Sequence, residues 1–321
     1  MRPQNTGWSV GLDIGGTKTL AVLLDPTGAP GDQLRLPTER GAEAVVDTAA
    51  TAAADLLARA DLHADQLTGI GIGLPGIVDP TTGRVEHAVN LGIATGIPLA
   101  ERVAEAVHRR LNGRGGAAPV PVRVENDLNA AALGAAHLRG PGSGDLAFLA
   151  LGTGLAAGLV LDGRLRRGAG GAAGEIGHLV YQPGGRPCPC GQRGCLEQYA
   201  SGSALLAAWP GPGDRPAPVA LFEAADAGDP AAVTIRTEFA EAVATAVRVL
   251  LLTTDVAQVV IGGGVSELGS PLVDLVRARL DHAARESRFL ASMRMAERVD
   301  LAPRGVPVGA VGAALVGRKE S

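Results

Sequence analysis

The chain has 321 residues, about twice the usual length of one domain, and 46% of them are hydrophobic, so two folded domains are expected and disorder is excluded. Its formal net charge is -4, from 29 Lys and Arg against 33 Asp and Glu, which gives no electrostatic reason to expect nucleic acid or an anionic membrane as a partner. Glycine is frequent (46 residues), lysine occurs only at Lys18 and Lys319, and the three cysteines lie together between 188 and 195.

The segment 1–10 carries no apolar run of signal-peptide length. The longest uncharged apolar stretch, 146–161, has 16 residues and is interrupted by a glycine turn, so it is short for a membrane span. Three clustered cysteines without distant partners do not suggest a secreted disulfide framework. We therefore expect a soluble cytoplasmic protein.

Strands and helices alternate in the first part of the chain. The predicted strands are 9–14, 19–24, 68–74 and 120–125, and the predicted helices are 42–60, 98–111 and 128–137. Turns are expected at 15–17, 26–28, 75–76 and 79–83, and a loop at 140–144.

The rest of the chain continues this mixture. A strand, glycine turn and strand are predicted within 145–163, followed by loops at 183–195 and 209–218, a long helix at 230–253 and a strand at 258–261. A helix from about 271, a strand near 299 and a helix from about 308 close the chain. Together these elements predict an α/β fold.

Two glycine hairpins have similar sequences. The first contains Asp13, Gly15, Gly16, Thr17 and Lys18, and the second contains Gly152, Thr153 and Gly154. Glycine turns let backbone N–H groups converge on an anion, and the carboxylate, hydroxyl and ammonium of the first hairpin suit a γ-phosphate with its Mg²⁺. The first hairpin has neither the P-loop nor the dinucleotide-binding pattern, because a strand follows the turn instead of a helix.

Either hairpin alone also fits an ordinary β-turn, with Lys18 facing solvent. Their repetition about 140 residues apart, with a glycine triplet at Gly262, Gly263 and Gly264, predicts two similarly folded halves that close on one nucleotide.

Four motifs in order resemble the ROK family of bacterial sugar kinases and repressors, especially its glucokinases and N-acetylhexosamine kinases. They are Asp13-Ile14-Gly15-Gly16-Thr17-Lys18, Glu125-Asn126-Asp127, Glu175-Ile176-Gly177-His178 and Cys188-Pro189-Cys190-Gly191-Gln192-Arg193-Gly194-Cys195-Leu196-Glu197. The resemblance spans about residues 9–315. It implies a two-lobed, actin-like (ribonuclease-H-like) ATPase fold with ATP and sugar in the cleft between the lobes, and a homodimer or homotetramer.

In this scheme residues 1–124 form a smaller N-terminal α/β lobe, against which a C-terminal helix at about 305–321 packs. Residues 125–304 form a larger α/β lobe that carries a cysteine-rich loop.

One imidazole and three thiols fall within 18 residues, from His178 through Cys188 and Cys190 to Cys195. A Cys₃His set is typical of a closed, structural zinc site. The alternatives are a redox pair or unrelated thiols, although a Cys-x-Cys disulfide is strained and disfavoured in the cytosol. The resemblance adds that Glu175, Glu197 and His178 contact the sugar.

Asp127 follows a predicted strand and precedes a predicted helix, so it suits a helix N-cap. The resemblance implies instead, or in addition, the general base that accepts the proton of the sugar hydroxyl. Asn126 then binds sugar hydroxyls, and Gly76 offers backbone to the sugar, unless the Pro75-Gly76 pair is only a strand-ending turn. Asn90 either caps a loop or approaches the sugar.

The chain departs from the pattern of many family glucokinases at Ala156-Ala157, where a glycine run is common. These two Cβ atoms either narrow the phosphate site or only stiffen the hairpin. The segment 92–96 also lacks a tryptophan that is frequent in glucokinases.

The leading hypothesis is an ATP- and Mg²⁺-dependent kinase for the 6-hydroxyl of a hexose, with glucose as first choice. The same chemistry on N-acetylglucosamine, N-acetylmannosamine, fructose or an aminodeoxyglucose is the alternative. A sugar-sensing repressor is disfavoured because only 12 residues precede Asp13, too few for a DNA-binding module. A catalytically silent sugar sensor is disfavoured because Asp13, Lys18 and Asp127 are all present.

Overall fold

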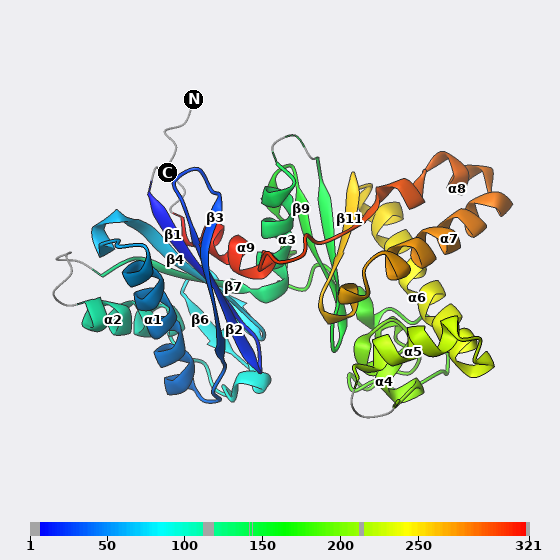
Figure 1. Cartoon of the computed structure of the whole chain (residues 1–321), viewed down its shortest axis with the longest axis horizontal. Helices are drawn as coiled ribbons and strands as arrows, with labels where there is room; N and C mark the ends of the chain where they lie inside the picture. Colours follow the sequence, from blue (N-terminus) through cyan, green and yellow to red (C-terminus); the bar gives the residue numbers. More distant parts are fainter. Residues whose placement is uncertain (1–6, 112–118, 141, 143, 212–214, 319–321) are drawn as a thin grey trace. The chain divides into compact units, whose positions relative to one another are not determined.

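The computed structural model describes residues 7–111, 119–140, 142, 144–211 and 215–318, and divides into two compact units (Figure 1). The first unit combines Met1–Pro141 with Pro303–Ser321, and the second is the continuous segment Gly142–Ala302. Each unit has its own five-stranded sheet and its own aliphatic core. None of the described helices is long and apolar enough to span a membrane.

The first sheet has the strand order β3-β2-β1-β4-β7. The strands β1, β2 and β3 form an antiparallel meander, and β4 and β7 continue the sheet parallel to β1. The elements of this unit are β1 (Trp8–Ile14), β2 (Lys18–Leu24), β3 (Pro30–Pro37), α1 (Ala42–Arg59), β4 (Leu67–Leu74), β5 (Ile77–Asp79), β6 (Arg84–Glu86), α2 (Leu99–Leu111), β7 (Val122–Asn126), α3 (Asp127–Leu138) and α9 (Val308–Gly317). Short 3₁₀ turns lie at Ala64–Gln66 and Val89–Leu91.

The second sheet has the order β10-β9-β8-β11-β12 and repeats the first: a meander followed by two parallel strands. Its unit contains β8 (Leu146–Leu151), β9 (Leu155–Leu161), β10 (Arg164–Leu165), α4 (Gly202–Ala208), α5 (Ala217–Asp226), α6 (Pro230–Thr254), β11 (Gln258–Gly262), α7 (Ser270–Glu286), α8 (Arg288–Ser292) and β12 (Val299–Leu301). Short 3₁₀ turns lie at Ile176–His178, Leu196–Gln198, Gly264–Leu268 and Met295–Arg298. The predicted α/β class and the similarity of the two halves are confirmed.

Alternation along β1 assigns the two faces of the first sheet. Val10, Leu12 and Ile14 are fully buried in the core that α1 and α2 cover. Gly11 and Asp13 therefore point to the opposite face, on which α9 and α3 lie (Figure 1). Asp13 stands at the carboxyl end of this face.

Glycine allows α9 to pack directly on backbone. A Cβ added at Gly11 would lie 1.9 Å from the Ala310 carbonyl oxygen, and one added at Gly71 would lie 1.7 Å from the oxygen of Ala313. Gly312 meets α3 in the same way, with its added Cβ 1.7 Å from the Ala130 oxygen. Part of the glycine excess is thus a packing requirement of this helix, which the sequence pattern did not reveal.

The first unit extends beyond the expected boundary at residue 124. That boundary falls inside β7, which pairs with β4, while α3 makes its main contacts with α9. Parts of three expected segments lie outside the described residues: 141 and 143 of the loop at 140–144, 212–214 of the loop at 209–218, and 319–321 of the C-terminal helix, which α9 forms from Val308 to Gly317.

Candidate active site

Three parallel strands of the first unit end at one edge of the sheet. Asp13 of β1 is in register with Gly73 of β4, which is in register with Glu125 of β7. Because the carboxyl ends of parallel strands share an edge, the polar groups that follow them converge there. This edge brings together Asp13 and the start of α3, which the sequence had placed more than 100 residues apart.

Asn126, not Asp127, is the N-cap of α3. Its Oδ1 accepts hydrogen bonds from the backbone N–H groups of Leu128 (3.0 Å) and Asn129 (3.3 Å). Asp127 is the first residue of the helix, and its Oδ1 accepts from the N–H of Leu128 at 2.9 Å. The Asn126 amide oxygen is therefore already engaged, and its Nδ2 group is the part suited to donate to a ligand.

The fully buried carboxylate of Glu125 stabilises the N-terminus of α3 through hydrogen bonds, a role that the sequence did not reveal. Its Oε1 accepts from the backbone N–H of Asn126 at 3.1 Å and from Asn129 Nδ2 at 2.9 Å. Buried carboxylates require such donors. Asn126 and Asp127, both half-buried, are consequently held on a fixed frame.

Burial, and next the negative charge of Asp127, raise the pKa of Asp13 to about 7, while the ammonium of Lys18 acts in the opposite direction. These interactions place Asp13, Lys18 and Asp127 within electrostatic range of one another in the same unit. A cluster of two carboxylates and one ammonium on a sheet edge is suited to phosphate and divalent-cation chemistry.

The first glycine turn joins β1 to β2. The N–H of Gly15 donates to the Lys18 oxygen at 3.0 Å, and the oxygen of Thr17 accepts from the N–H of Thr38 at 3.2 Å. The side chains of Thr17 and Lys18 are exposed. Gly16 lies against Asn90, whose Cβ would be 3.2 Å from a Cβ added at Gly16, so Asn90 borders this turn.

Gly76 turns the chain after β4 in a left-handed conformation, with φ of 111°. A Cβ added there would lie 2.9 Å from the oxygen of Glu86 and 3.0 Å from Cα of Ala88. Glycine is therefore required here by both backbone angle and space.

The second glycine turn joins β8 to β9 in the other unit, where the N–H of Gly152 donates to the Gly154 oxygen at 3.1 Å. Gly263, with φ of 86°, packs on the end of β8, since its added Cβ would lie 2.5 Å from the Leu151 oxygen. The predicted turns 152–154 and 262–264 are thus neighbours. Ala157 is buried in the core and Ala156 is partly exposed, so only the methyl group of Ala156 is open to solvent.

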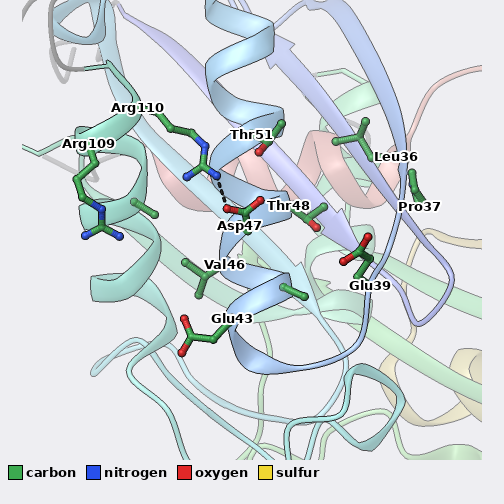
Figure 2. Close-up of a pocket in the computed structure, with 12 residues that line it drawn as sticks. Leu36, Pro37, Glu39, Glu43, Val46, Asp47, Thr48, Thr51, Arg109 and Arg110 are labelled. Atoms are coloured by element: carbon green, nitrogen blue, oxygen red, sulfur yellow. Dashed lines mark hydrogen bonds and ion pairs between the residues drawn. The ribbon is translucent and has the colours of Figure 1, made fainter.

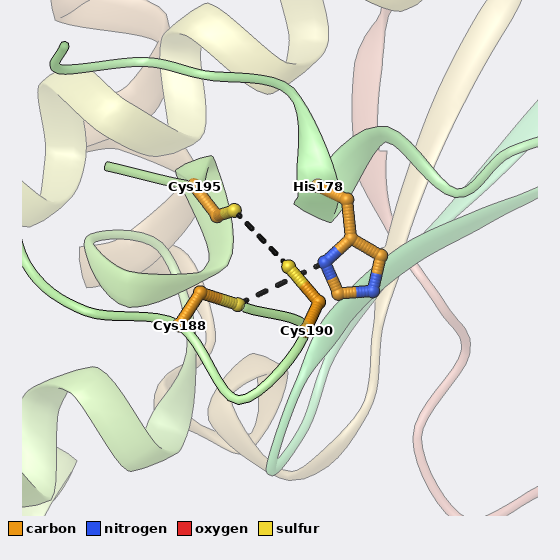
Figure 3. A group of neighbouring side chains, drawn as sticks. All are labelled: His178, Cys188, Cys190 and Cys195. Carbon is orange, nitrogen blue, oxygen red and sulfur yellow. Dashed lines mark hydrogen bonds between the residues drawn. The ribbon is translucent and has the colours of Figure 1, made fainter. Parts of the chain in front are cut away.

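His178, Cys188, Cys190 and Cys195 converge, with their ligand atoms within 4.8 Å of one another (Figure 3). Cys190 Sγ lies 3.7 Å from Cys195 Sγ, and Cys188 Sγ lies 3.9 Å from His178 Nδ1. Tetrahedral zinc with Zn–S bonds of about 2.3 Å separates two sulfurs by about 3.8 Å, so the four groups fit zinc and not a disulfide.

Groups around the cluster support this fit. The backbone N–H of Gln192 is the main group that lowers the pKa of Cys190, to about 6, which favours the thiolate that zinc requires. Burial raises the pKa of Cys195 to about 12, so its thiolate depends on the positive charge of a bound cation. The amides of Gln192 and Gln198 donate to Cys190 Sγ (3.5 Å) and Cys188 Sγ (3.6 Å). His178 Nε2, the nitrogen that does not face the sulfurs, lies 3.9 Å from Glu175 Oε2.

Glu197 follows the last cysteine by two residues and is half-buried. Its Oε2 accepts from the backbone N–H of Leu155 at 2.9 Å, beside the second glycine turn. Glu175 is exposed, and its Oε2 lies 3.9 Å from His178 Nε2. The two glutamates that flank the cysteine loop therefore have different surroundings.

A separate pocket of about 580 Å³ lies over α1, α2 and the end of β3 (Figure 2). Its lining is mixed in charge, and Asp47 forms an ion pair with Arg110 there. None of the predicted site residues lines it.

Comparison with known proteins gives a family match over residues 9–320 to the ROK family. A glucokinase of Halalkalibacterium halodurans is 33% identical over 293 residues, 85% of each chain, and an N-acetylmannosamine kinase of Citrobacter koseri is 32% identical over 80% of this chain and 83% of its own. The structure of a ROK family glucokinase from Streptomyces griseus in complex with glucose and AMPPNP matches with a TM-score of 0.73 at 33% identity, covering 97% of this chain and 99% of that one.

Proposed function

Because the chain belongs to the ROK family, we propose that it is an ATP-dependent hexose kinase that phosphorylates the 6-hydroxyl of glucose. The observation that carries the chemistry is the group formed by Asp13, Lys18 and Asp127 at one sheet edge. The choice of glucose rests on glucokinase relatives that are 33% and 34% identical over most of their length.

Asp127 is assigned as the general base. It accepts the proton of the sugar 6-hydroxyl as that oxygen attacks the γ-phosphorus of ATP, the bond from the γ-phosphorus to the bridging oxygen breaks, and ADP leaves. Such a reaction needs positioning more than a covalent nucleophile. The Glu125 and Asn126 frame at the start of α3 supplies that positioning.

The phosphates are assigned to the predicted glycine turns, with Thr17 and Lys18 as side-chain donors. Glycine leaves backbone N–H groups open to an anion. Asp13 is assigned to a divalent cation. Burial and the charge of Asp127 disfavour its ionised carboxylate, and a bound cation would offset both effects. Mg²⁺, when bound, neutralises charge on the phosphate oxygens.

Sugar hydroxyls are assigned to a set of backbone, amide, carboxylate and imidazole groups. This set comprises Gly76, Asn126, Asp127, Glu175, His178 and Glu197. Hydrogen bonds to such groups can discriminate one sugar from another strongly, because a lost hydroxyl leaves a polar partner unpaired. His178, Cys188, Cys190 and Cys195 would hold a zinc ion in a structural role, since four protein ligands would fill its tetrahedral coordination.

An ADP-release assay over a panel of hexoses tests the proposal. Turnover on glucose well above that on other hexoses is expected. Turnover confined to N-acetylmannosamine or another amino sugar would favour the second candidate, which the relative from Citrobacter koseri supports. An absence of turnover on every sugar would contradict a kinase. The homodimer or homotetramer that we also propose is measured by light scattering on the same preparation.

A further inference from the structure

One short segment holds both ends of the second glycine turn. The N–H of Leu155, just after the turn, donates to Glu197 Oε2 at 2.9 Å. The oxygen of Gly152, where the turn begins, accepts from the N–H of Gly202 at 2.7 Å. The segment 195–202 therefore forms hydrogen bonds with both ends of the turn. All of these residues belong to the second unit.

The contact is also close in space. A Cβ added at Gly154 would lie 2.5 Å from Glu197 Oε2, and one added at Gly202 would lie 2.8 Å from the Gly152 oxygen. At Gly202 the obstacle is backbone, so glycine there lets the segment and the turn meet, and at Gly154 the missing Cβ leaves room for the Glu197 carboxylate. The Glu197 carboxylate is therefore in direct contact with the turn.

The same segment begins in the zinc cluster. Cys195 is fully buried, and the N–H of Leu196 donates to the oxygen of Leu179 at 2.8 Å, next to His178. On the other side of the cluster, Gly177 packs on the Leu155 oxygen, which would lie 2.1 Å from an added Cβ. Two of the four proposed zinc ligands are thus within two residues of groups that touch Leu155.

We propose that Glu197 is a positioning residue for the nucleotide: it fixes the turn Gly152–Gly154 in its phosphate-binding shape and links that shape to the zinc cluster. The inference rests on the proposed function, in which this turn binds phosphate. It adds a second role to a residue that the resemblance to the ROK family associates with the sugar. Order in the cysteine loop then sets nucleotide affinity as well as sugar affinity.

Calorimetric titration of the full chain with ADP and Mg²⁺, without sugar, tests this role. Glu197→Ala removes the acceptor of the Leu155 N–H, and about tenfold weaker ADP binding is expected, which corresponds to about 1.4 kcal/mol. Glu197→Gln keeps an oxygen that can accept this bond and should bind ADP as the wild type does. Arg193→Ala is the matched control: it shortens an exposed side chain of the same loop that has no assigned ligand, and it should leave ADP affinity unchanged.

Hydrogen exchange of the Leu155 amide gives a second readout that needs no ligand. Exchange should be faster in Glu197→Ala and unchanged in Glu197→Gln and Arg193→Ala. If Glu197→Ala does not fold, Glu197→Asp replaces it, since its shorter side chain withdraws the carboxylate.

The outcomes separate the two proposals. Wild-type ADP affinity in folded Glu197→Ala, or unchanged exchange of Leu155, would overturn this inference alone. Failure of the wild type to bind ADP would overturn it together with the nucleotide part of the proposed function.

Discussion

At the scale of single residues, Asp127 bears the proposed proton transfer. Replacement by Asn keeps an oxygen for the Leu128 N–H but removes the base, so kcat should fall about 10²–10⁴-fold while the sugar still binds. A coupled ADP-release assay and calorimetric sugar binding measure the two effects.

Asp229→Asn is the matched control for this change. Asp229 also stands at a helix start, where its Oδ1 accepts from the N–H of Ala232 at 2.9 Å, and Asn serves equally well as an N-cap. Its kcat should equal that of the wild type. Near-normal turnover of Asp127→Asn would refute the assignment of the base.

Asp13 should make the ligand-free protein sensitive to pH. Its pKa is raised from 3.8 to about 7 on folding, so the stability linked to its protonation is complete below pH 4 and is lost as the pH rises to 7. The loss is at most about 1.4 kcal/mol per pH unit. The Asn side chain of Asp13→Asn does not titrate, so this variant does not lose stability in this way. The free energy of unfolding of the variant minus that of the wild type should therefore increase between pH 5 and pH 8.

Denaturant unfolding without ligand at the two pH values measures this difference. Asp32→Asn, which changes an exposed aspartate on β3 of the same unit, should show no comparable trend. Equal pH dependence of Asp13→Asn and the wild type would contradict the raised pKa.

At the scale of elements, features encoded by residues close together in the sequence could be predicted. Features that depend on contacts between distant parts of the chain could not. The first hairpin and the zinc ligands were predictable because their chemistry lies within a few residues of sequence. The strand β3 was missed since it is an exposed edge strand with little apolar alternation, bounded by Pro30 and Pro37. The helix α5 was hidden by the prolines of the expected loop at 209–218.

The site shows the same division. The types of residue at Asp13, Asp127 and the cysteine loop could be selected from motifs, but their neighbours could not. The buried bond between Glu125 and Asn129 and the bond from Leu155 to Glu197 depend on strand register and loop packing, which no local pattern encodes. Neither the cap role of Asn126 nor the backbone contacts of α9 followed from residue type alone.

The cysteine loop is an element whose order should depend on its metal. Removing zinc with a chelator, or replacing Cys195 by Ser, should lower the melting temperature and abolish sugar binding, because the loop carries His178 and is flanked by Glu175 and Glu197. Metal analysis should find one zinc per chain, and added zinc should restore the chelated protein. Arg193→Ala, a change in the same loop outside the ligand set, should retain zinc and sugar. Zinc-free protein that phosphorylates sugar at full rate would refute the role.

At the scale of the whole molecule, the two units have the same sheet topology, but only the first unit includes the C-terminal helix α9. The second unit is one continuous segment, whereas the first is completed only by α9, which returns after residue 302. Most of α9 is buried, and it covers the face of the sheet that carries Asp13. Its removal uncovers glycine-lined backbone on both β1 and β4.

Truncation after Ala302 should therefore unfold the first unit and spare the second. Hydrogen exchange should show lost protection in β1, β4 and α3, because their packing surface is gone, while β8 and β11 stay protected. Zinc content should remain at one per chain, since all four proposed ligands lie in the second unit. A shorter truncation that removes only 319–321 leaves α9 intact and should match the wild type. Retained protection of β1 without α9 would show that the first sheet does not need this helix. Loss of protection in both units would show that the second does not fold independently.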